Sequence, residues 1–289
     1  MKKTVSLLTA ALLVLAFSAC RQTGPKIQDL NPPLSFINTQ DSASFLLTAD
    51  QQLWPPESDT IGVSNSYSIA WPSPGHLTPK AERELLLLVF GDSSATTFRQ
   101  AATTWLANTW FYEEDIPHLR RHPVQGSVPA RLPSNYGRLH STAAVDSTLI
   151  HFTVSSETST AFAAHGLYTT HYLTIDRSRG RVVHLIDLLD TALLGPVIVR
   201  AVEDLVVNKP VLESLFDEYR GQPTLPQPDD FFIDSAHTCI TLVYQLYTIA
   251  PYACGIQSVV LPIFWLSKHI PLTPYAKELF GPEAYLPES

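Results

Sequence analysis

Three polar residues have the types that hydrolytic chemistry requires: Ser93, Asp234 and His237. Ser93 follows an apolar run and a Gly-Asp pair, and Asp234-x-x-His237 lies in the last quarter of the chain. A serine hydroxyl becomes a nucleophile when an imidazole accepts its proton, and a carboxylate orients that imidazole. One reading of these residues is therefore a serine hydrolase.

The block Gly91-Asp92-Ser93 resembles the serine block of the GDSL (SGNH) esterases. In that family the block ends the first strand near the mature N-terminus, and a Gly-x-Asn-Asp segment completes the oxyanion hole. Here Ser93 comes much later, and the sequence contains no Gly-x-Asn-Asp segment. Loss of one oxyanion donor lowers the rate on the order of a hundredfold. We interpret the match as a chance one and Asp234–His237 as a turn, and keep the hydrolase as an alternative.

The residues around Ser93 predict helices rather than a strand. Thr78 is a candidate N-cap, Pro79 suits a first helical position, and Gly91 suits the residue after a helix end. We therefore expect a buried helix from Lys80 to Phe90. Ser93 or Ser94 would cap a second helix with one apolar face, formed by Phe98, Ala101, Ala102, Trp105 and Thr109.

The first twenty residues predict export and lipid attachment. Lys2 and Lys3 precede an apolar segment that leads to Ser18-Ala19-Cys20, a pattern typical of a signal peptide and too short for a comfortable transmembrane helix. The end of the segment resembles a bacterial lipobox, which implies acylation of Cys20 and a signal peptide over residues 1–19. Two or more acyl chains give stable membrane anchoring. An ordinary signal peptide cut near Ala19 is the alternative.

Composition excludes several classes of partner. The chain is 45% hydrophobic, enough for a packed core, and its formal charge of −8 becomes −10 when Lys2 and Lys3 are removed with the signal. Such an acidic protein without a basic stripe is a poor candidate for nucleic acid or anionic lipid surfaces. Arg21, rather than aspartate, after the lipidated cysteine favours the outer membrane, with the body facing the periplasm.

We expect no metal or cofactor from the sequence. His118 and His122 have metal-like spacing, but Pro117 and two arginines between the histidines argue against a site. Cys239 and Cys254 lack a clustered histidine or a Cys-x-x-Cys spacing, so they do not indicate zinc. In an oxidising compartment these two cysteines could instead form a disulfide, which their spacing alone does not decide.

Patterning predicts an α+β fold with antiparallel sheets and packed helices, because strands and helices occur in separate groups. Residues 20–58 are rich in Pro, Gln, Asn, Asp and Ser and predict a lipidated tether, with a short extended piece at Phe36 or Phe45–Leu47. An N-terminal lobe (59–164) and a C-terminal domain (165–289) follow. The expected elements are strands at 60–71, 146–157, 165–176, 231–233, 238–246 and 258–266, and helices at 194–207 and 211–220.

The second half of the chain resembles the C-terminal domain of the RsiV-type family. The matching features are Asp176-x-x-x-Gly180, the run Leu185–Leu189, the segment "YTIAPYACG" from Tyr247 to Gly255, and His165-Gly166 upstream. That family includes lysozyme-sensing anti-sigma factors, the accessory region of PdaC-type peptidoglycan deacetylases and many envelope lipoproteins. The resemblance implies a non-catalytic sensing or binding domain, since no metal-binding deacetylase motif follows.

The best-matched segments supply the candidate binding residues: Tyr247, Tyr252, His165 and Tyr168. Tyrosines are favoured at interfaces, while a structural corner made by Pro251 and Gly255, and structural roles for His165 and His171, are the alternatives. We therefore predict a lipid-anchored cell-envelope protein that is not an enzyme. It would bind a protein, such as a lysozyme-like enzyme, or a cell-wall glycan. A structural envelope lipoprotein is the third reading, beside the hydrolase.

Overall fold

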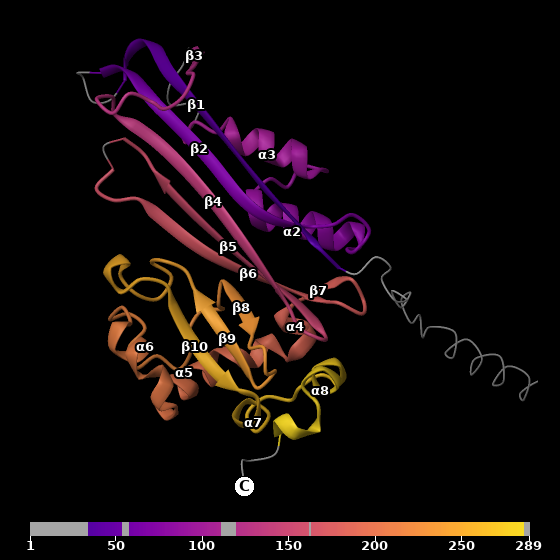
Figure 1. Ribbon diagram of the computed structural model, residues 1–289. Coiled ribbons are helices and arrows are strands. Elements are labelled where there is room, and N and C mark those ends of the chain that lie inside the picture. Colours follow the sequence, from indigo (N-terminus) through magenta and orange to yellow (C-terminus); the bar gives the residue numbers. More distant parts are fainter. Residues whose placement is uncertain (1–33, 54–57, 111–119, 162, 286–289) are drawn as a thin grey trace, which may run out of the picture.

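The computed structural model describes residues 34–53, 58–110, 120–161 and 163–285. The predicted signal peptide, Cys20 and His118 lie outside the described residues. Figure 1 shows a large sheet and a small sheet, each with helices packed on it. The predicted α+β class is confirmed. No helix among the described residues is long and apolar enough to cross a membrane.

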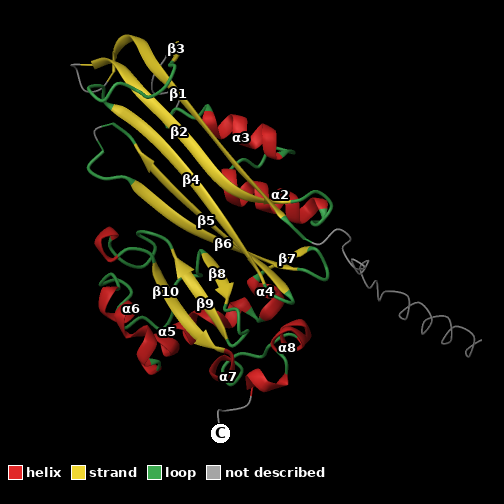
Figure 2. Ribbon diagram, in the orientation of Figure 1, coloured by secondary structure: helices red, strands yellow, loops and turns green. Residues whose placement is uncertain are grey.

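The large sheet has seven strands in the order β3-β1-β2-β4-β5-β6-β7. Neighbouring strands are antiparallel except β2 and β4, which run parallel. Figure 2 shows these long strands as one continuous twisted layer. The bounds are β1 (Phe36–Leu53), β2 (Ser58–Pro72), β3 (Arg120–Pro123), β4 (Ser134–Val145), β5 (Leu149–Ser159), β6 (Leu167–Asp176) and β7 (Arg181–Val183). Because β6 belongs to this sheet, the sheet continues across the boundary predicted at residues 164 and 165.

Strand β1 corrects the predicted tether, which extended to Ser58. The chain is already paired with β2 at Phe36, opposite Pro72. Phe45 and Leu47 are buried, while Asn38, Gln40, Asp41, Ser42 and Ser44 are half-buried or exposed. A strand with one polar face carries such residues without penalty. Because these polar residues are abundant, the segment has the composition of a linker although it forms a strand.

Helices α2 (Pro79–Phe90) and α3 (Phe98–Leu106) cover one face of the large sheet. The caps of α2 are as predicted: the Thr78 hydroxyl accepts from the Ala81 amide, and Gly91 is left-handed at φ 68°. The cap of α3 is Thr97, not Ser93 or Ser94. The two serines lie in a turn in which the Asp92 carboxylate accepts from the amide and hydroxyl of Ser94, so the predicted cap is wrong by three to four residues.

The small sheet has three antiparallel strands in the order β10-β9-β8, namely β10 (Gln257–Pro262), β9 (Cys239–Tyr244) and β8 (Asp230–Ile233). The strand predicted at 258–266 ends early, at Pro262 of the edge strand β10, because proline cannot donate to a sheet ladder, and residues 263–266 are helical. Helical segments surround this sheet: α4 (Leu185–Leu188), α5 (Leu194–Asp204), α6 (Lys209–Ser214), α7 (Ile263–Leu266), α8 (Pro274–Phe280), η1 (Thr191–Leu193), η2 (Val206–Asn208), η3 (Tyr252–Cys254) and η4 (Pro282–Tyr285).

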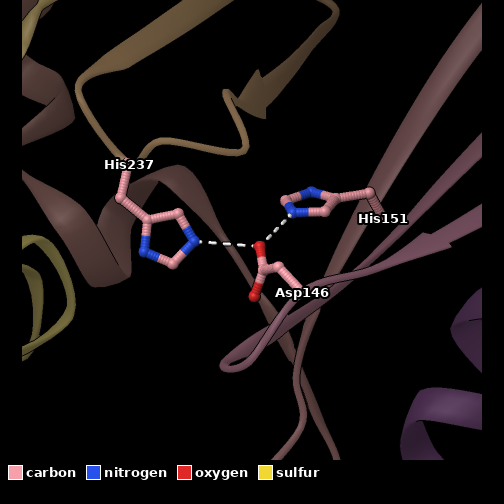
Figure 3. A group of neighbouring side chains, drawn as sticks. All are labelled: Asp146, His151 and His237. Atoms are coloured by element: carbon pink, nitrogen blue, oxygen red, sulfur yellow. Dashed lines mark hydrogen bonds and ion pairs between the residues drawn. The ribbon is translucent and has the colours of Figure 1, made fainter.

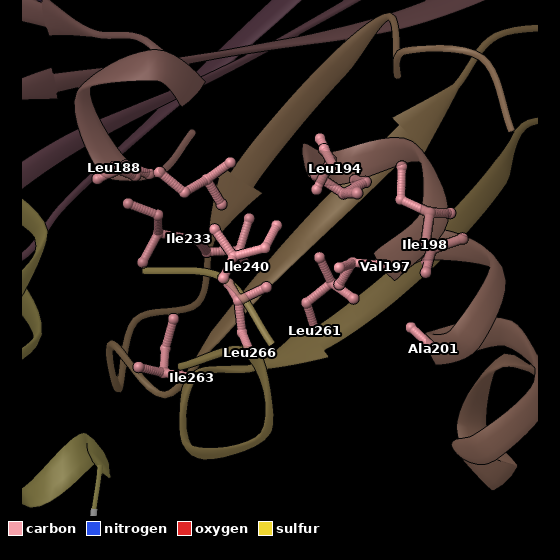
Figure 4. Close-up of a cluster of buried hydrophobic side chains, with 14 of the residues drawn as sticks. Leu188, Leu194, Val197, Ile198, Ala201, Ile233, Ile240, Leu261, Ile263 and Leu266 are labelled. Carbon is pink, nitrogen blue, oxygen red and sulfur yellow. The ribbon is translucent and has the colours of Figure 1, made fainter. Parts of the chain in front are cut away.

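The small sheet and its helices enclose a second apolar core (Figure 4). Helix α5, which lies within the predicted helix 194–207, contributes the buried side chains of Ile198, Ala201 and Val202 to this core. Strands β9 and β10 supply Ile240 and Leu261 from the other side. Burial of each such side chain stabilises the fold by about 1.5–3 kcal/mol relative to exposure.

The two sheets meet where β6 contacts β8. His171 of β6 lies 2.7 Å from the Asp230 carboxylate of β8. Gln245, just after β9, bonds both backbone groups of Thr170, with its amide nitrogen 2.6 Å from the carbonyl oxygen. These polar links hold the small sheet in register with one edge of the large sheet.

Candidate functional site

Three of the four residues predicted to bind a ligand converge on the ring of the fourth, Tyr252. The His165 imidazole stacks on this ring with centroids 3.9 Å apart and planes 24° apart. Tyr168 meets it edge-on at 6.0 Å, and Tyr247 lies at 5.7 Å. Tyr168 comes from β6, His165 from the loop before it, and the other two from the segment between β9 and β10. We call these four residues the aromatic cluster.

Hydrogen bonds fix the geometry of the aromatic cluster. The Tyr252 hydroxyl donates to the Gly166 carbonyl at 2.9 Å, and the same carbonyl accepts from Nδ1 of His165 at 3.0 Å. Because a carbonyl only accepts, Nδ1 carries the proton, so Nε2 of neutral His165 accepts from the Tyr247 hydroxyl at 3.3 Å. The hydroxyls of both tyrosines and the imidazole therefore have partners within the cluster.

The backbone that presents these rings is constrained. Tyr247 is left-handed at φ 66°, a conformation that costs a non-glycine residue about 1–2 kcal/mol. Asp229 holds it in place, since its carboxylate accepts from the Gln245 amide and the Thr248 hydroxyl. Gly255 has φ 73° and ψ −168°, and a Cβ there would lie 3.2 Å from the Tyr168 hydroxyl. Only glycine fits this position without strain.

A cavity of about 600 Å³ adjoins the aromatic cluster. Strands β4, β5 and β6 form its floor, and Tyr252 and Tyr168 are among its walls. Hydroxyl groups line the floor, with Ser156 bonded to Thr169 at 2.9 Å across β5 and β6. The exposed Arg138–Glu157 ion pair, 3.2 Å apart, also borders the cavity. We call the cavity and the aromatic cluster together the aromatic groove.

His171 does not join the aromatic groove. It lies on β6, whereas His165 precedes the strand. The hydrogen bond that His171 donates to the Asp230 carboxylate raises the pKa of His171, burial opposes this, and the charges of Asp230 and Asp229 add to the rise. His171 is thus a structural histidine between the two sheets.

The structure does not bring together the three residues of the hydrolase alternative. Asp234 accepts from the amides of Thr238 and Cys239, within its own turn. His237 bonds Asp146 instead.

Ser93 also lies on the other side of the large sheet from His237. Ile150 and Phe152 of β5 pack in the core with α2 and α3, the helices that flank Ser93. His151 alternates with them, so its side chain leaves the opposite face, where it meets the Asp146 carboxylate that also bonds His237. The sheet therefore separates the serine from the imidazole.

The cysteines do not form the disulfide that the sequence left open: both are free. Cys239 pairs with Pro262 at one end of the β9–β10 ladder. Cys254 lies beyond the other end, where Tyr244 pairs with Gln257. The length of a six-residue strand, roughly 20 Å, separates these ends, and a disulfide requires Cα atoms within about 7 Å.

A cluster that the sequence analysis missed consists of Asp146, His151 and His237 (Figure 3). Oδ2 of Asp146 lies 3.0 Å from Nε2 of His151 and 2.9 Å from Nε2 of His237. Burial raises the pKa of the Asp146 carboxyl. Hydrogen bonds from the amides of Leu149 and Thr148 and from the two imidazoles lower it by more, so the net pKa is far below its usual range. These three residues come from a turn, a strand and a second turn. Their spacing in the sequence matches no known motif, so no sequence signal could find them.

The other pair with metal-like spacing is His118 and His122, of which only His122 lies among the described residues. His122 of β3 bonds the Thr48 hydroxyl of β1 at 3.0 Å. The cluster of Asp146, His151 and His237 is the one group of three potential metal ligands among the described residues.

Known proteins resemble this chain in fold but not detectably in sequence. No protein-family model matches the sequence, and no curated protein resembles it significantly. A crystallised member of the DUF3298 family from Bacteroides fragilis matches with a TM-score of 0.51 and 17% identity, over 84% of this chain and 94% of that one. A DUF3298 family protein from Pseudomonas aeruginosa matches with a TM-score of 0.48 and 14% identity, over 84% and 95%. In fold, this chain is similar to the DUF3298 family proteins of bacteria.

Proposed function

We propose that this chain is a lipid-anchored cell-envelope protein whose folded body binds a ligand in the aromatic groove without catalysing a reaction. The observation that carries this proposal is the convergence of His165, Tyr168 and Tyr247 on the ring of Tyr252, beside a cavity of about 600 Å³. That volume lies within the range of small-molecule sites, about 300–1,000 Å³.

The chemistry of the groove favours a cell-wall glycan as the ligand. Aromatic rings offer flat apolar faces on which the C–H faces of a sugar ring can pack, and tyrosine combines such a face with a polar tip. The hydroxyl-lined floor exchanges hydrogen bonds with sugar hydroxyls. Arg138 and Glu157 at the border can contact the charged groups of a peptide stem.

Exposed rings also support binding of a protein. Tyr247 is 52% exposed and Tyr168 is 37% exposed, and tyrosine is enriched at protein interfaces. The resemblance to lysozyme-sensing proteins makes a lysozyme-like enzyme the protein to test.

Membrane attachment rests on the sequence alone, through the lipobox-like segment that ends at Cys20. Metabolic labelling of cells with a radioactive or clickable fatty acid tests it. We expect label in the wild-type protein and none after Cys20→Ser. Equal labelling of both proteins would contradict the anchor.

Two binding assays on one soluble chain separate the ligands. The chain should begin at Arg21, because β1 starts at Phe36 and a start at Ser58 would remove it. Co-sedimentation with insoluble peptidoglycan tests the glycan, and size-exclusion chromatography with lysozyme tests the protein. Tyr247→Ala should weaken whichever of the two interactions is observed by at least tenfold. Phe264→Ala, an exposed aromatic residue of α7 outside the groove, is the matched control. Binding of neither probe would refute the proposal.

A further inference from the structure

We infer that Asp146, His151 and His237 form a site for one divalent transition-metal ion, zinc in the first place, which links the large sheet to the small sheet. The inference is independent of the proposed function. It rests on the donor set, on the spacing of the donor atoms and on the elements that carry them.

The donor set fits the ion. Two imidazole nitrogens and one carboxylate oxygen are ligands typical of zinc, and the same set holds iron(II) in many non-haem proteins. In the described chain these three donor atoms lie within 4.8 Å of one another. No other described residues offer such a group.

The spacing needs little adjustment. Around a tetrahedral ion with bonds of about 2.0–2.1 Å, ligand atoms are separated by roughly 3.3 Å. Oδ2 of Asp146 lies 3.0 and 2.9 Å from the two Nε2 atoms. An increase of a few tenths of an ångström between Oδ2 and each Nε2 would match that spacing, and the donor nitrogens of the two histidines lie within 4.8 Å of each other.

The carboxylate is already oriented for this role. Oδ1 of Asp146 accepts from the amides of Thr148 at 2.7 Å and Leu149 at 2.6 Å, which leaves Oδ2 to face the imidazoles (Figure 3). Hydrogen bonds to the free oxygen of a ligating carboxylate are a regular feature of metal sites.

The histidines can adopt the form that a metal requires. A metal at Nε2 needs the lone pair of that nitrogen, so the proton must move to Nδ1. Nδ1 of His151 is buried and no described group bonds it, so no donor opposes a proton there, and a water molecule would have to accept its hydrogen bond. His237 is held in the left-handed region, at φ 57°, by the turn that Asp234 closes. That strained backbone aims its imidazole across the sheet interface.

The site would act as a cross-link and leave one position for water. Asp146 and His151 belong to the β4–β5 hairpin of the large sheet, and His237 belongs to the β8–β9 turn of the small sheet. The three side chains are 19%, 18% and 15% exposed, which admits a water to the fourth position of a tetrahedral ion.

The first test is a zinc titration of the whole mature chain after chelator treatment, by competition with a chromophoric chelator. The chain should carry Cys239→Ser and Cys254→Ser, because free thiols also bind zinc. We expect one ion per chain, a rise in melting temperature with zinc, and at least a hundredfold weaker binding after His151→Ala or His237→Ala. Parallel titrations with iron(II) and manganese(II) identify the preferred ion, and calcium is the negative control.

Two variants guard against misfolding as an explanation. Asp146→Asn keeps the shape of the side chain but removes its charge, and should also weaken zinc binding. His171→Ala removes the other His–Asp link between the sheets and should leave zinc binding unchanged. No bound transition metal below about 100 µM, or equal binding by wild type and the folded His151→Ala and His237→Ala variants, would overturn the inference.

Discussion

The His165 imidazole stacks on the Tyr252 ring with centroids 3.9 Å apart, although the two residues are separated by most of the small-sheet domain in sequence. Gly166 links them as well, since its carbonyl accepts from both side chains. This contact joins the start of β6 to the segment between β9 and β10. It supports the wall of the aromatic groove that Tyr252 forms.

The Tyr252 hydroxyl should stabilise the fold as well as shape the groove. Tyr252→Phe removes the hydrogen bond to Gly166 but keeps the ring, so we expect a loss of about 0.5–1.5 kcal/mol in the free energy of unfolding. Tyr252→Ala also removes the stack and should cost more. Urea denaturation measures both. A Tyr252→Phe variant as unstable as Tyr252→Ala would contradict the assigned role of the ring.

Two glycines allow the geometry of the groove to be separated from backbone strain. Gly255 (φ 73°, ψ −168°) and Gly281 (φ 72°, ψ 166°) have nearly the same conformation. Alanine at either should destabilise the fold by about 1–3 kcal/mol. Only at Gly255 would the new Cβ meet another side chain, Tyr168. We therefore expect Gly255→Ala to weaken ligand binding and Gly281→Ala to leave it unchanged; the reverse order would exclude the assigned packing of Tyr168.

The His171–Asp230 pair predicts a pH dependence of stability. The pKa of His171 is raised in the folded chain, chiefly by Asp230. Its contribution is therefore fully present below the unfolded pKa, about 6.5, and is lost as the pH rises through the higher folded pKa. The difference in unfolding free energy between wild type and His171→Gln, measured from pH 5 to 9, should be largest at the acidic end. A difference that does not change with pH would contradict the ion pair.

The two free thiols should differ in reactivity. Burial raises the pKa of Cys239, which lowers its thiolate fraction, while Cys254 is exposed. We expect iodoacetamide to modify Cys254 first in the native chain, and both residues after denaturation without a reductant. Peptide mass spectrometry follows the modification. A chain that gains neither label until it is reduced would show a disulfide.

The sequence predicted the elements whose signals are local. Thr78, Pro79 and Gly91 mark the ends of α2 because capping depends on a few neighbouring residues. Most of strand β1 was missed because polar residues such as Asn38, Gln40, Asp41 and Ser42 gave the segment the composition of a linker. Strand β4 and helix α8 were not expected at all.

Some of the candidate site residues could be predicted from the sequence and others could not. His165, Tyr168, Tyr247 and Tyr252 were predicted together because they lie in the segments that resemble a known family, and the fold brings them into contact. Asp146, His151 and His237 were not predicted. Their proximity depends on how the small sheet docks on β5, a tertiary relationship that neither spacing nor periodicity encodes.

The most direct test of the aromatic groove is an equilibrium titration of soluble peptidoglycan fragments into the chain from Arg21 to Ser289, by calorimetry. If the ligand binds in the aromatic groove, we expect saturable binding by wild type, at least tenfold weaker binding by folded Tyr247→Ala, and unchanged binding by Phe264→Ala. Equal binding by all three proteins would place the ligand elsewhere and contradict the account. No binding by wild type would contradict the glycan as its ligand.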